Sequence, residues 1–155
     1  MKYIKTKKIL NQAVADLSAV SAMIHQIHWY MRGPNFIKLH PQMDCYMEQV
    51  DAQLDVISER LITLDGSPYS TLREWADNAK IKQEPGIWGI STEKRFAELI
   101  LTLRYMTKLY QEGLDTTDAE GDNVTNGIFG DFKGEFEQLI WMLRAELNLA
   151  PEIDR

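Results

Sequence analysis

The sequence predicts an all-α fold, a four-helix bundle that carries one short helix in the connection between its second and third helices. Four long segments repeat apolar residues at helical spacing, and no segment shows the strict alternation of a half-buried strand. Glycine and proline gather between these segments, where helices end. At 155 residues, the chain is expected to form a single domain, 1–155, around one core.

The first half of the chain predicts two long helices joined by a tight turn. The first is expected over 7–31, where isoleucine, leucine, valine and alanine recur every three or four residues. Gly33 and Pro34 interrupt that pattern. The second helix is expected over 35–64, because Gly66 supplies a C-terminal stop signal just beyond it. The short turn makes the two helices antiparallel neighbours.

The middle of the chain predicts a crossover segment at 67–90 that contains several prolines and glycines. Within it, Thr71 and Glu74 have the spacing of a capping box, which predicts the start of a short helix. A third long helix is expected over 92–112. A four-helix bundle with one long crossover of this kind resembles the ferritin-like arrangement.

The last long helix is expected over 118–149, with Pro151 just after its end. Thr117 and Glu120 have capping-box spacing and are assigned to its start. Several glycines weaken the first half of this helix, each by about 1 kcal/mol relative to alanine. They are Gly121, Gly127, Gly130 and Gly134.

The charge and the cysteine content restrict the class of protein. A formal net charge of −6 and a pI near 5.1 argue against a generally basic nucleic-acid binder. Cys45 is the single cysteine, so no intrachain disulfide can form, which is typical of a reducing compartment. No apolar run reaches the length of a signal peptide or a transmembrane helix. We therefore expect a soluble, cytoplasmic protein without a membrane partner.

The predicted second helix combines a histidine with an acidic stripe. His40 and Asp44 are four residues apart, as are Asp55 and Glu59, so each pair lies on one face of the helix. No lysine or arginine lies between Leu39 and Glu59. Uncompensated carboxylates at this spacing repel one another unless a cation lies between them. The stripe is therefore either a solvated acidic face or a cation site.

One chain cannot bring these two pairs of residues to a single ion. His40 and Asp55 are separated by about 22 Å along a continuous helix, whereas a metal lies about 2 Å from its ligands. Antiparallel pairing of two copies of this helix around a two-fold axis places the histidine end of each copy against the carboxylate end of the other. The sequence thus favours two half-sites that are completed in a dimer.

His28 lies near the end of the predicted first helix, so the hairpin is expected to bring it close to His40. With His25, these are the only histidines in the chain, and a structural role is the alternative for each. Imidazole and carboxylate ligands suit iron, manganese or zinc, and open coordination positions suit redox chemistry at Fe(II). The patterns Glu-x-x-His and His-Glu-x-x-His are absent, which disfavours a di-iron site inside one bundle and a zinc protease.

The histidines and carboxylates belong to a longer pattern, whose residues are His28, Trp29, Gly33, Phe36, Leu39, His40, Asp44, Asp55, Glu59 and Arg60. This pattern resembles the Dps family of mini-ferritins, in particular its peroxide-resistance branch from Gram-positive bacteria. Every ligand type and every gap agrees with the family pattern, and the resemblance extends to 120–126 and 140–143.

The resemblance implies a hollow dodecamer of tetrahedral symmetry with a ferroxidase site between two-fold-related subunits. In that site His28, His40 and Asp44 come from one subunit, and Asp55 and Glu59 come from the other. Members of the family oxidise Fe(II), preferably with hydrogen peroxide, and store ferric mineral, which protects DNA from oxidative damage. The sequence leaves the choice between hydrogen peroxide and oxygen open, as well as competition from zinc or manganese.

The resemblance also assigns residues around the site. Trp29 is similar to a family tryptophan that lies beside the site and absorbs stray oxidising equivalents; a core or interface aromatic is the alternative. Asp118 and Asp122 resemble acids that line the family's iron-uptake pore. Asn123 and Gly127 stand where relatives often carry aspartate, so we expect a less acidic pore and slower iron uptake.

Two other functions compete with iron oxidation. The first is a nucleoid-associated structural protein, because some relatives bind DNA through a lysine-rich tail; here almost no tail precedes the first predicted helix. The second is an acidic bundle that binds another metal without redox turnover. The lysines near the start of the chain are Lys2, Lys5, Lys7 and Lys8.

Overall fold

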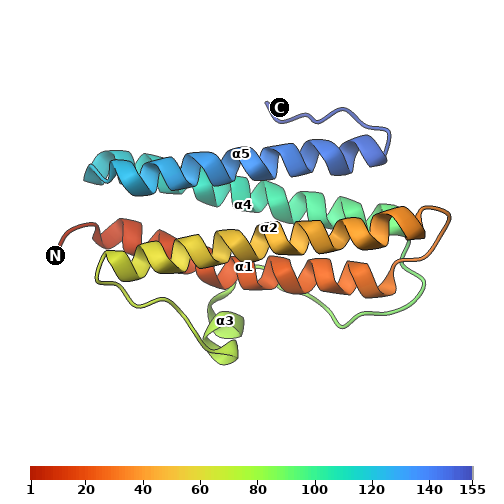
Figure 1. Cartoon of the computed structure of the whole chain (residues 1–155), viewed down its shortest axis with the longest axis horizontal. Helices are drawn as coiled ribbons and strands as arrows, with labels where there is room; N and C mark the ends of the chain where they lie inside the picture. The colour runs from red at the N-terminus through yellow and green to blue at the C-terminus, as the bar shows by residue number, and fades with distance from the viewer. Residues whose placement is uncertain (155) are drawn as a thin grey trace.

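The computed structural model describes residues 1–154 and confirms the all-α fold. The helices in this part of the chain are α1 (Ile4–Tyr30), α2 (Phe36–Thr63), α3 (Leu72–Asn78), α4 (Thr92–Glu120) and α5 (Asn123–Glu146). Figure 1 shows two antiparallel pairs, α1 with α2 and α4 with α5, packed as a four-helix bundle. The short α3 lies outside the bundle, in the crossover beside α1. None of the described helices has the length and apolar character needed to cross a membrane.

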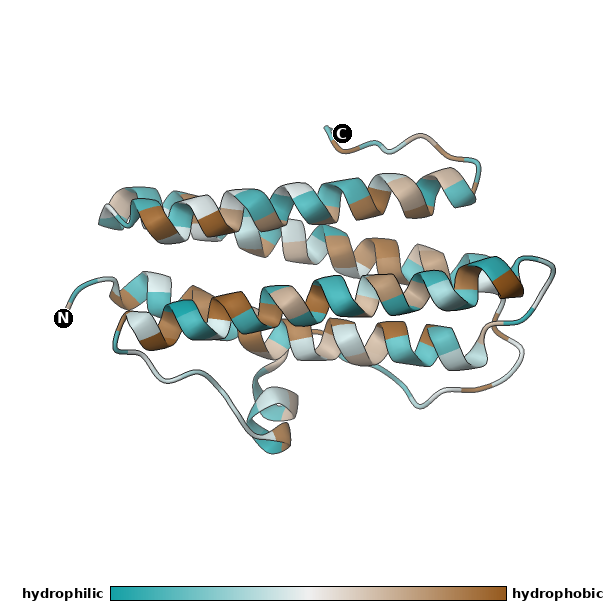
Figure 2. Cartoon of the chain, in the orientation of Figure 1, coloured by the Kyte–Doolittle hydropathy of each residue, from teal (hydrophilic) through white to brown (hydrophobic). Residues whose placement is uncertain are grey.

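The hydrophobic core lies between the two helix pairs. Figure 2 shows that hydrophobic and hydrophilic residues alternate along every long helix, as expected for helices with one buried face. On α1, Leu10, Leu17 and Ile24 recur every seven residues, which is about two helical turns, and none of them is exposed to solvent. The periodicity that predicts the helices therefore also identifies the faces that they bury.

The hairpin of α1 and α2 forms as the sequence predicts. Gly33 has a φ of 129°, in a region that favours glycine, and this allows the chain to reverse direction. After α2, the backbone N–H of Gly66 donates to the carbonyl of Leu61 at 2.8 Å and satisfies one of the last helical carbonyls. Both helices begin and end within three residues of the expected positions.

The crossover is fixed at two places. The predicted capping box is present, since the N–H of Glu74 donates to Thr71 Oγ1 at 3.1 Å and the N–H of Thr71 donates to Glu74 Oε2 at 3.0 Å. Further along, the N–H groups of Lys80 and Ile81 donate to Asp16 Oδ1 at 2.7 and 3.2 Å. Because Asp16 is fully buried on α1, the crossover is attached to the bundle itself.

The predicted boundary between the last two long helices is wrong. Helix α4 continues past 112 to Glu120, and α5 begins at Asn123 rather than at 118. Gly113, which interrupts the apolar pattern in the sequence, lies within α4, and the ring of Phe129 occupies the space that a Cβ atom would need, 2.6 Å away. Helix α5 ends at Glu146, three residues before the predicted position.

Thr117 and Glu120 do not form a capping box, contrary to the prediction. The hydroxyl of Thr117 donates to the carbonyl of Gly113 at 2.7 Å, inside α4. The carboxylate of Glu120 accepts hydrogen bonds from the N–H groups of Lys5 and Thr6 at 3.1 and 3.0 Å. Burial raises the pKa of Glu120, but these hydrogen bonds outweigh it and hold the pKa below its usual value. Glu120 thus caps α1, which begins earlier than expected.

Candidate metal centre

His28 and His40 face each other at the hairpin of α1 and α2. Their imidazole rings are stacked, with centroids 3.6 Å apart and planes inclined by 12°. His28 Nδ1 donates to the carbonyl of His40 at 2.7 Å, and His40 Nδ1 donates to the carbonyl of His28 at 2.9 Å. A carbonyl oxygen can only accept, so each Nδ1 carries a proton, and in the neutral ring Nε2 then presents a lone pair. This is the tautomer in which a histidine binds a metal through Nε2.

Asp44 lies beside this histidine pair. Its Oδ1 is 3.6 Å from His28 Nε2, and its side chain is 58% exposed, whereas that of His28 is 11% exposed. The ring of Phe36 lies 4.8 Å from the ring of His40. The hairpin therefore brings together the three residues that the sequence assigns to one half-site, with the imidazoles anchored and the carboxylate at the surface.

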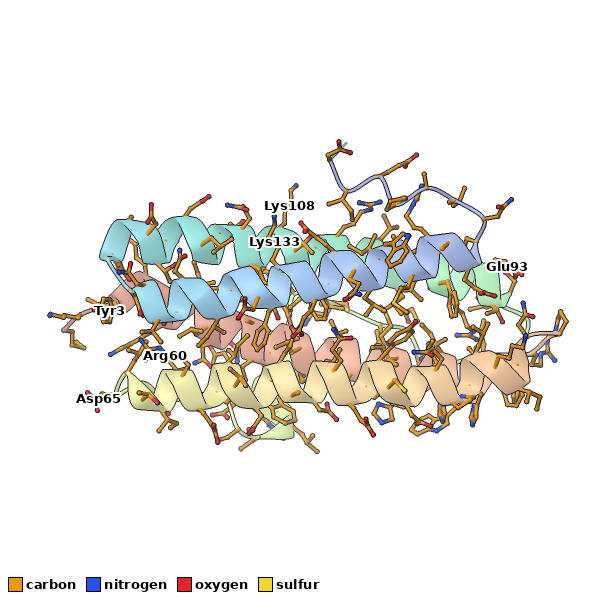
Figure 3. All side chains as sticks on the ribbon, turned by 45° about the horizontal axis from the view of Figure 1, so that its top comes forward. Tyr3, Arg60, Asp65, Glu93, Lys108 and Lys133 are labelled. Carbon is orange, nitrogen blue, oxygen red and sulfur yellow. The ribbon has the colours of Figure 1, made fainter. Side chains whose placement is uncertain are left out.

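Asp55 and Glu59 lie further along α2, and both are exposed. Neither forms an ion pair with the described residues. Figure 3 shows side chains of α2 that project away from α5 into the surroundings of the bundle. Within residues 1–154, no group of three or more histidine, cysteine, aspartate or glutamate side chains is placed to hold a metal ion. One chain therefore presents two separate, incomplete ligand sets on one helix.

Trp29 follows His28 on α1 but lies at the surface. Its side chain is 64% exposed, and its ring lies 5.4 Å from the ring of His25. The Nδ1 atom of His25 donates to the carbonyl of Ser21 at 2.7 Å. The alternative that Trp29 is a core aromatic is therefore wrong. A role at an interface and a redox role stay predictions.

Arg60 has a structural role that the ligand pattern does not reveal. From α2 it donates through Nη2 to Asp122 Oδ1 and through Nε to Thr125 Oγ1, both at 2.8 Å. Asp122 is also the N-cap of α5, where it accepts from the N–H of Thr125 at 3.1 Å. The three-residue spacing of Asp122 and Thr125 is an N-cap signal in the sequence. The partnership with Arg60 joins residues 62 positions apart and has no local signal.

The two candidate acids of the iron-uptake pore differ in their surroundings. Asp122 is only 3% exposed. Burial raises the pKa of its carboxyl, but the hydrogen bonds from Thr125 and the charge of Arg60 outweigh burial and hold the pKa below its usual value of 3.8. Its charge is thus already compensated within the chain. Asp118, in the last turn of α4, is exposed and is the better placed of the two to meet an incoming cation.

Known proteins resemble this chain over nearly its whole length. Residues 7–153 match the family of the ferritin-like domain. The "DNA protection during starvation protein" of Streptococcus suis (strain P1/7) is 49% identical over 148 residues, which span 96% of this chain and 86% of the relative.

Solved structures agree with this match. The Dps structure from Listeria monocytogenes has a TM-score of 0.92 at 42% identity, covering 94% of this chain and 95% of that one. The Dps structure from Staphylococcus aureus has a TM-score of 0.89 at 26% identity, covering 96% and 98%. The ferritin-like arrangement and the resemblance read from the ligand pattern are confirmed. The chain belongs to the Dps family of mini-ferritins.

Proposed function

We propose that this protein is a ferroxidase that oxidises Fe(II) with hydrogen peroxide and stores the ferric product in a dodecameric cage, which protects DNA from oxidative damage. The observation that carries the proposal is the orientation of His28 and His40, whose Nε2 atoms are both available as ligands beside Asp44. Membership of a family whose relatives are named for DNA protection during starvation supports the same conclusion.

Each site is proposed to lie between two subunits related by a two-fold axis. Asp55 and Glu59 are on the same helix as His40 but about 22 Å along it, beyond the reach of a shared ion. In an antiparallel pair of α2 helices, the histidine end of one subunit meets the carboxylate end of the other, and symmetry repeats the arrangement. The dimer therefore contains two complete sites, and the single chain contains none.

Two Fe(II) ions held side by side can supply both electrons that cleave the O–O bond of hydrogen peroxide. Two Fe(II), one hydrogen peroxide and two waters give two FeOOH units and four protons. Each iron loses one electron and both peroxide oxygens are reduced, so no hydroxyl radical is released. Imidazole and carboxylate ligands suit this use of iron, and they also suit Zn(II) or Mn(II) as competitors.

Three further residues have roles in this proposal. Trp29 adjoins the site in sequence and is exposed in the single chain, so it is available to donate an electron when oxidising equivalents escape the paired irons. Asp118 is exposed at the end of α4 and is proposed to attract Fe(II) to the cage wall. Asp122, which is buried against Arg60, keeps the α4–α5 turn in shape.

Mixed cages test whether the site is shared. One variant carries His28→Ala with His40→Ala, and the other carries Asp55→Ala with Glu59→Ala. Each variant alone should fail to oxidise Fe(II) after anaerobic loading and addition of peroxide. After random co-assembly, half of the dimers contain one subunit of each kind, and each such dimer regains one of its two sites. We therefore expect about a quarter of the activity of the unaltered cage.

Two outcomes of the mixed-cage experiment would contradict a shared site. Mixed cages as inactive as their components would show that all ligands come from one chain. Full activity in either double variant would show that other residues bind the iron. Gel filtration of all four preparations, including the unaltered protein, checks that the substitutions leave assembly intact.

A further inference from the structure

A groove runs between α1, α4 and the crossover, and none of the proposed iron ligands lines it. Its volume is about 530 Å³, within the range of about 300–1,000 Å³ that is usual for small-molecule sites. The crossover approaches the start of α4 along this side of the bundle (Figure 1). Most of the groove wall is apolar, and the apolar residues are Met23, Ile27, Pro85, Ile87, Ile90 and Leu101.

Arg95 lines this groove and is only 3% exposed. One guanidinium nitrogen, Nη2, donates to the carbonyl of Ile87 at 2.7 Å, and the guanidinium lies over the ring of Tyr30 with its central carbon 5.5 Å from the ring centroid. Its Nε is buried and has no hydrogen-bond partner among the described residues. No carboxylate in the same part of the chain forms an ion pair with it.

This environment is unfavourable for a cation. A buried charge without a counter-ion costs several kcal/mol in general, and an unmade hydrogen bond adds to that cost. Arg95 is also the fourth residue of α4, close to the positive end of the helix dipole, which disfavours a positive charge. The ring of Tyr30 offsets only part of this cost. An anion bound in the groove against the guanidinium would supply the missing counter-charge.

We propose that the α1/α4 groove, formed by the residues named above, binds a small organic monocarboxylate with an apolar body. The carboxylate pairs with the guanidinium of Arg95, and the body covers the apolar wall that includes Leu101, whose side chain is 68% exposed. Lys82, Glu84 and Glu98 also line the groove and are exposed at its rim. Two carboxylates against one ammonium leave the rim net negative, which disfavours a dianion such as phosphate more than a monoanion. The groove is separate from the iron chemistry, so this inference does not depend on it.

Calorimetric titration of the assembled protein with octanoate tests the proposal. We expect saturable binding, no binding of the uncharged octanamide, and binding of acetate at least about tenfold weaker than that of octanoate. The last expectation follows because two buried methylene groups already account for about that factor. Inorganic phosphate is expected not to compete.

Three variants locate the site. Arg95→Met removes the charge and keeps an apolar side chain of similar length, so it should fold and lose octanoate binding at least about tenfold. Leu101→Glu leaves Arg95 in place but puts a like charge beside the ligand, and it should also abolish binding. Lys108→Met is the matched control, because Lys108 is exposed on the same helix and lines no part of the groove.

Several outcomes overturn the assignment. Equal binding of octanoate and octanamide would remove the role of charge. Unchanged affinity in Arg95→Met, or an equal loss in Lys108→Met, would remove Arg95 as the anchor. Tighter binding of phosphate than of octanoate would contradict the monocarboxylate class.

Discussion

His28 and His40 orient each other. The Nδ1–H of each ring donates to the backbone carbonyl of the other residue, at 2.7 and 2.9 Å, and the two rings are stacked 3.6 Å apart. In metal sites a carbonyl or carboxylate often fixes the ligating histidine in this way. Because both acceptors are backbone carbonyls, each residue orients the other ring through its main chain, and that hydrogen bond remains when its own imidazole is replaced.

His40→Phe is expected to remove one ligand and leave the other in place. The phenyl ring can keep the stack but has no Nε2, and the carbonyl of residue 40 still accepts from His28 Nδ1–H. Loss of an orienting partner alone typically lowers metal affinity by about 10–100-fold, so loss of the ligand itself should lower Fe(II) affinity by at least about tenfold. Anaerobic calorimetric titration with Fe(II) measures the change.

The matched control for this prediction is His25→Phe. His25 is the third histidine, lies one helical turn before His28, and donates its Nδ1–H to its own helix at Ser21. We expect its substitution to leave Fe(II) affinity unchanged. If His25→Phe weakened Fe(II) binding as much as His40→Phe, the pairing of His28 with His40 would not explain the site.

The ion pair of Arg60 and Asp122 predicts a pH-dependent contribution to stability. Removing one partner of a buried pair leaves the other charge uncompensated, so Asp122→Asn should lower the free energy of unfolding by about 3 kcal/mol at neutral pH. The pKa of Asp122 lies below 3.8 in the folded chain. The stabilisation is therefore complete above pH 3.8 and is lost as the pH falls through the folded-state pKa.

Urea unfolding at several pH values and one protein concentration checks this. The difference between the parent and Asp122→Asn should shrink as the pH falls below 3.8. Asp118→Asn is the control, since Asp118 is exposed. In this variant the free energy of unfolding should change by no more than about 0.5 kcal/mol. Its rate of Fe(II) uptake should fall. A pH-independent difference would mean that the Asp122 charge is not the cause.

Asp16 is expected to hold the crossover on the bundle. It is fully buried and accepts from Lys80 N–H, Ile81 N–H and the Tyr105 hydroxyl, the last at 2.6 Å. Asp16→Asn places an amide donor among these donors, at a cost of about 1–3 kcal/mol. Hydrogen exchange at the Lys80 and Ile81 amides should become faster. Asp77→Asn, an exposed change on α3, should leave both rates unaltered, and equal rates in the two variants would contradict the role.

The sequence predicts those parts of the fold that depend on residues close to one another in the chain. Apolar periodicity places the long helices, and the spacing of Thr71 and Glu74 identifies the start of α3. Prediction from the sequence fails where a residue far away in the chain determines the local structure. Gly113 lies inside a helix at a place where Phe129 leaves no room for a side chain, and Glu120 caps α1 rather than its own helix.

The candidate site divides in the same way. The two half-sites follow from helical pitch, because the rise of about 1.5 Å per residue fixes how far His40 is from Asp55. The reciprocal hydrogen bonds of His28 and His40 do not follow from helical pitch, since they depend on how the α1–α2 hairpin closes. The partner of Arg60 is likewise set by the approach of the α4–α5 turn to α2.

DNA binding by this protein is expected to be negligible. Each chain carries a formal net charge of −6, and affinity for DNA is dominated by cations that neutralise phosphates. Free DNA and DNA mixed with the assembled protein should therefore migrate equally in a low-salt gel. Retardation that fades steeply with added salt would instead indicate phosphate contacts. The variant Lys5→Gln with Lys8→Gln, which removes two exposed lysines of the first helix, would then show whether the amino end makes those contacts.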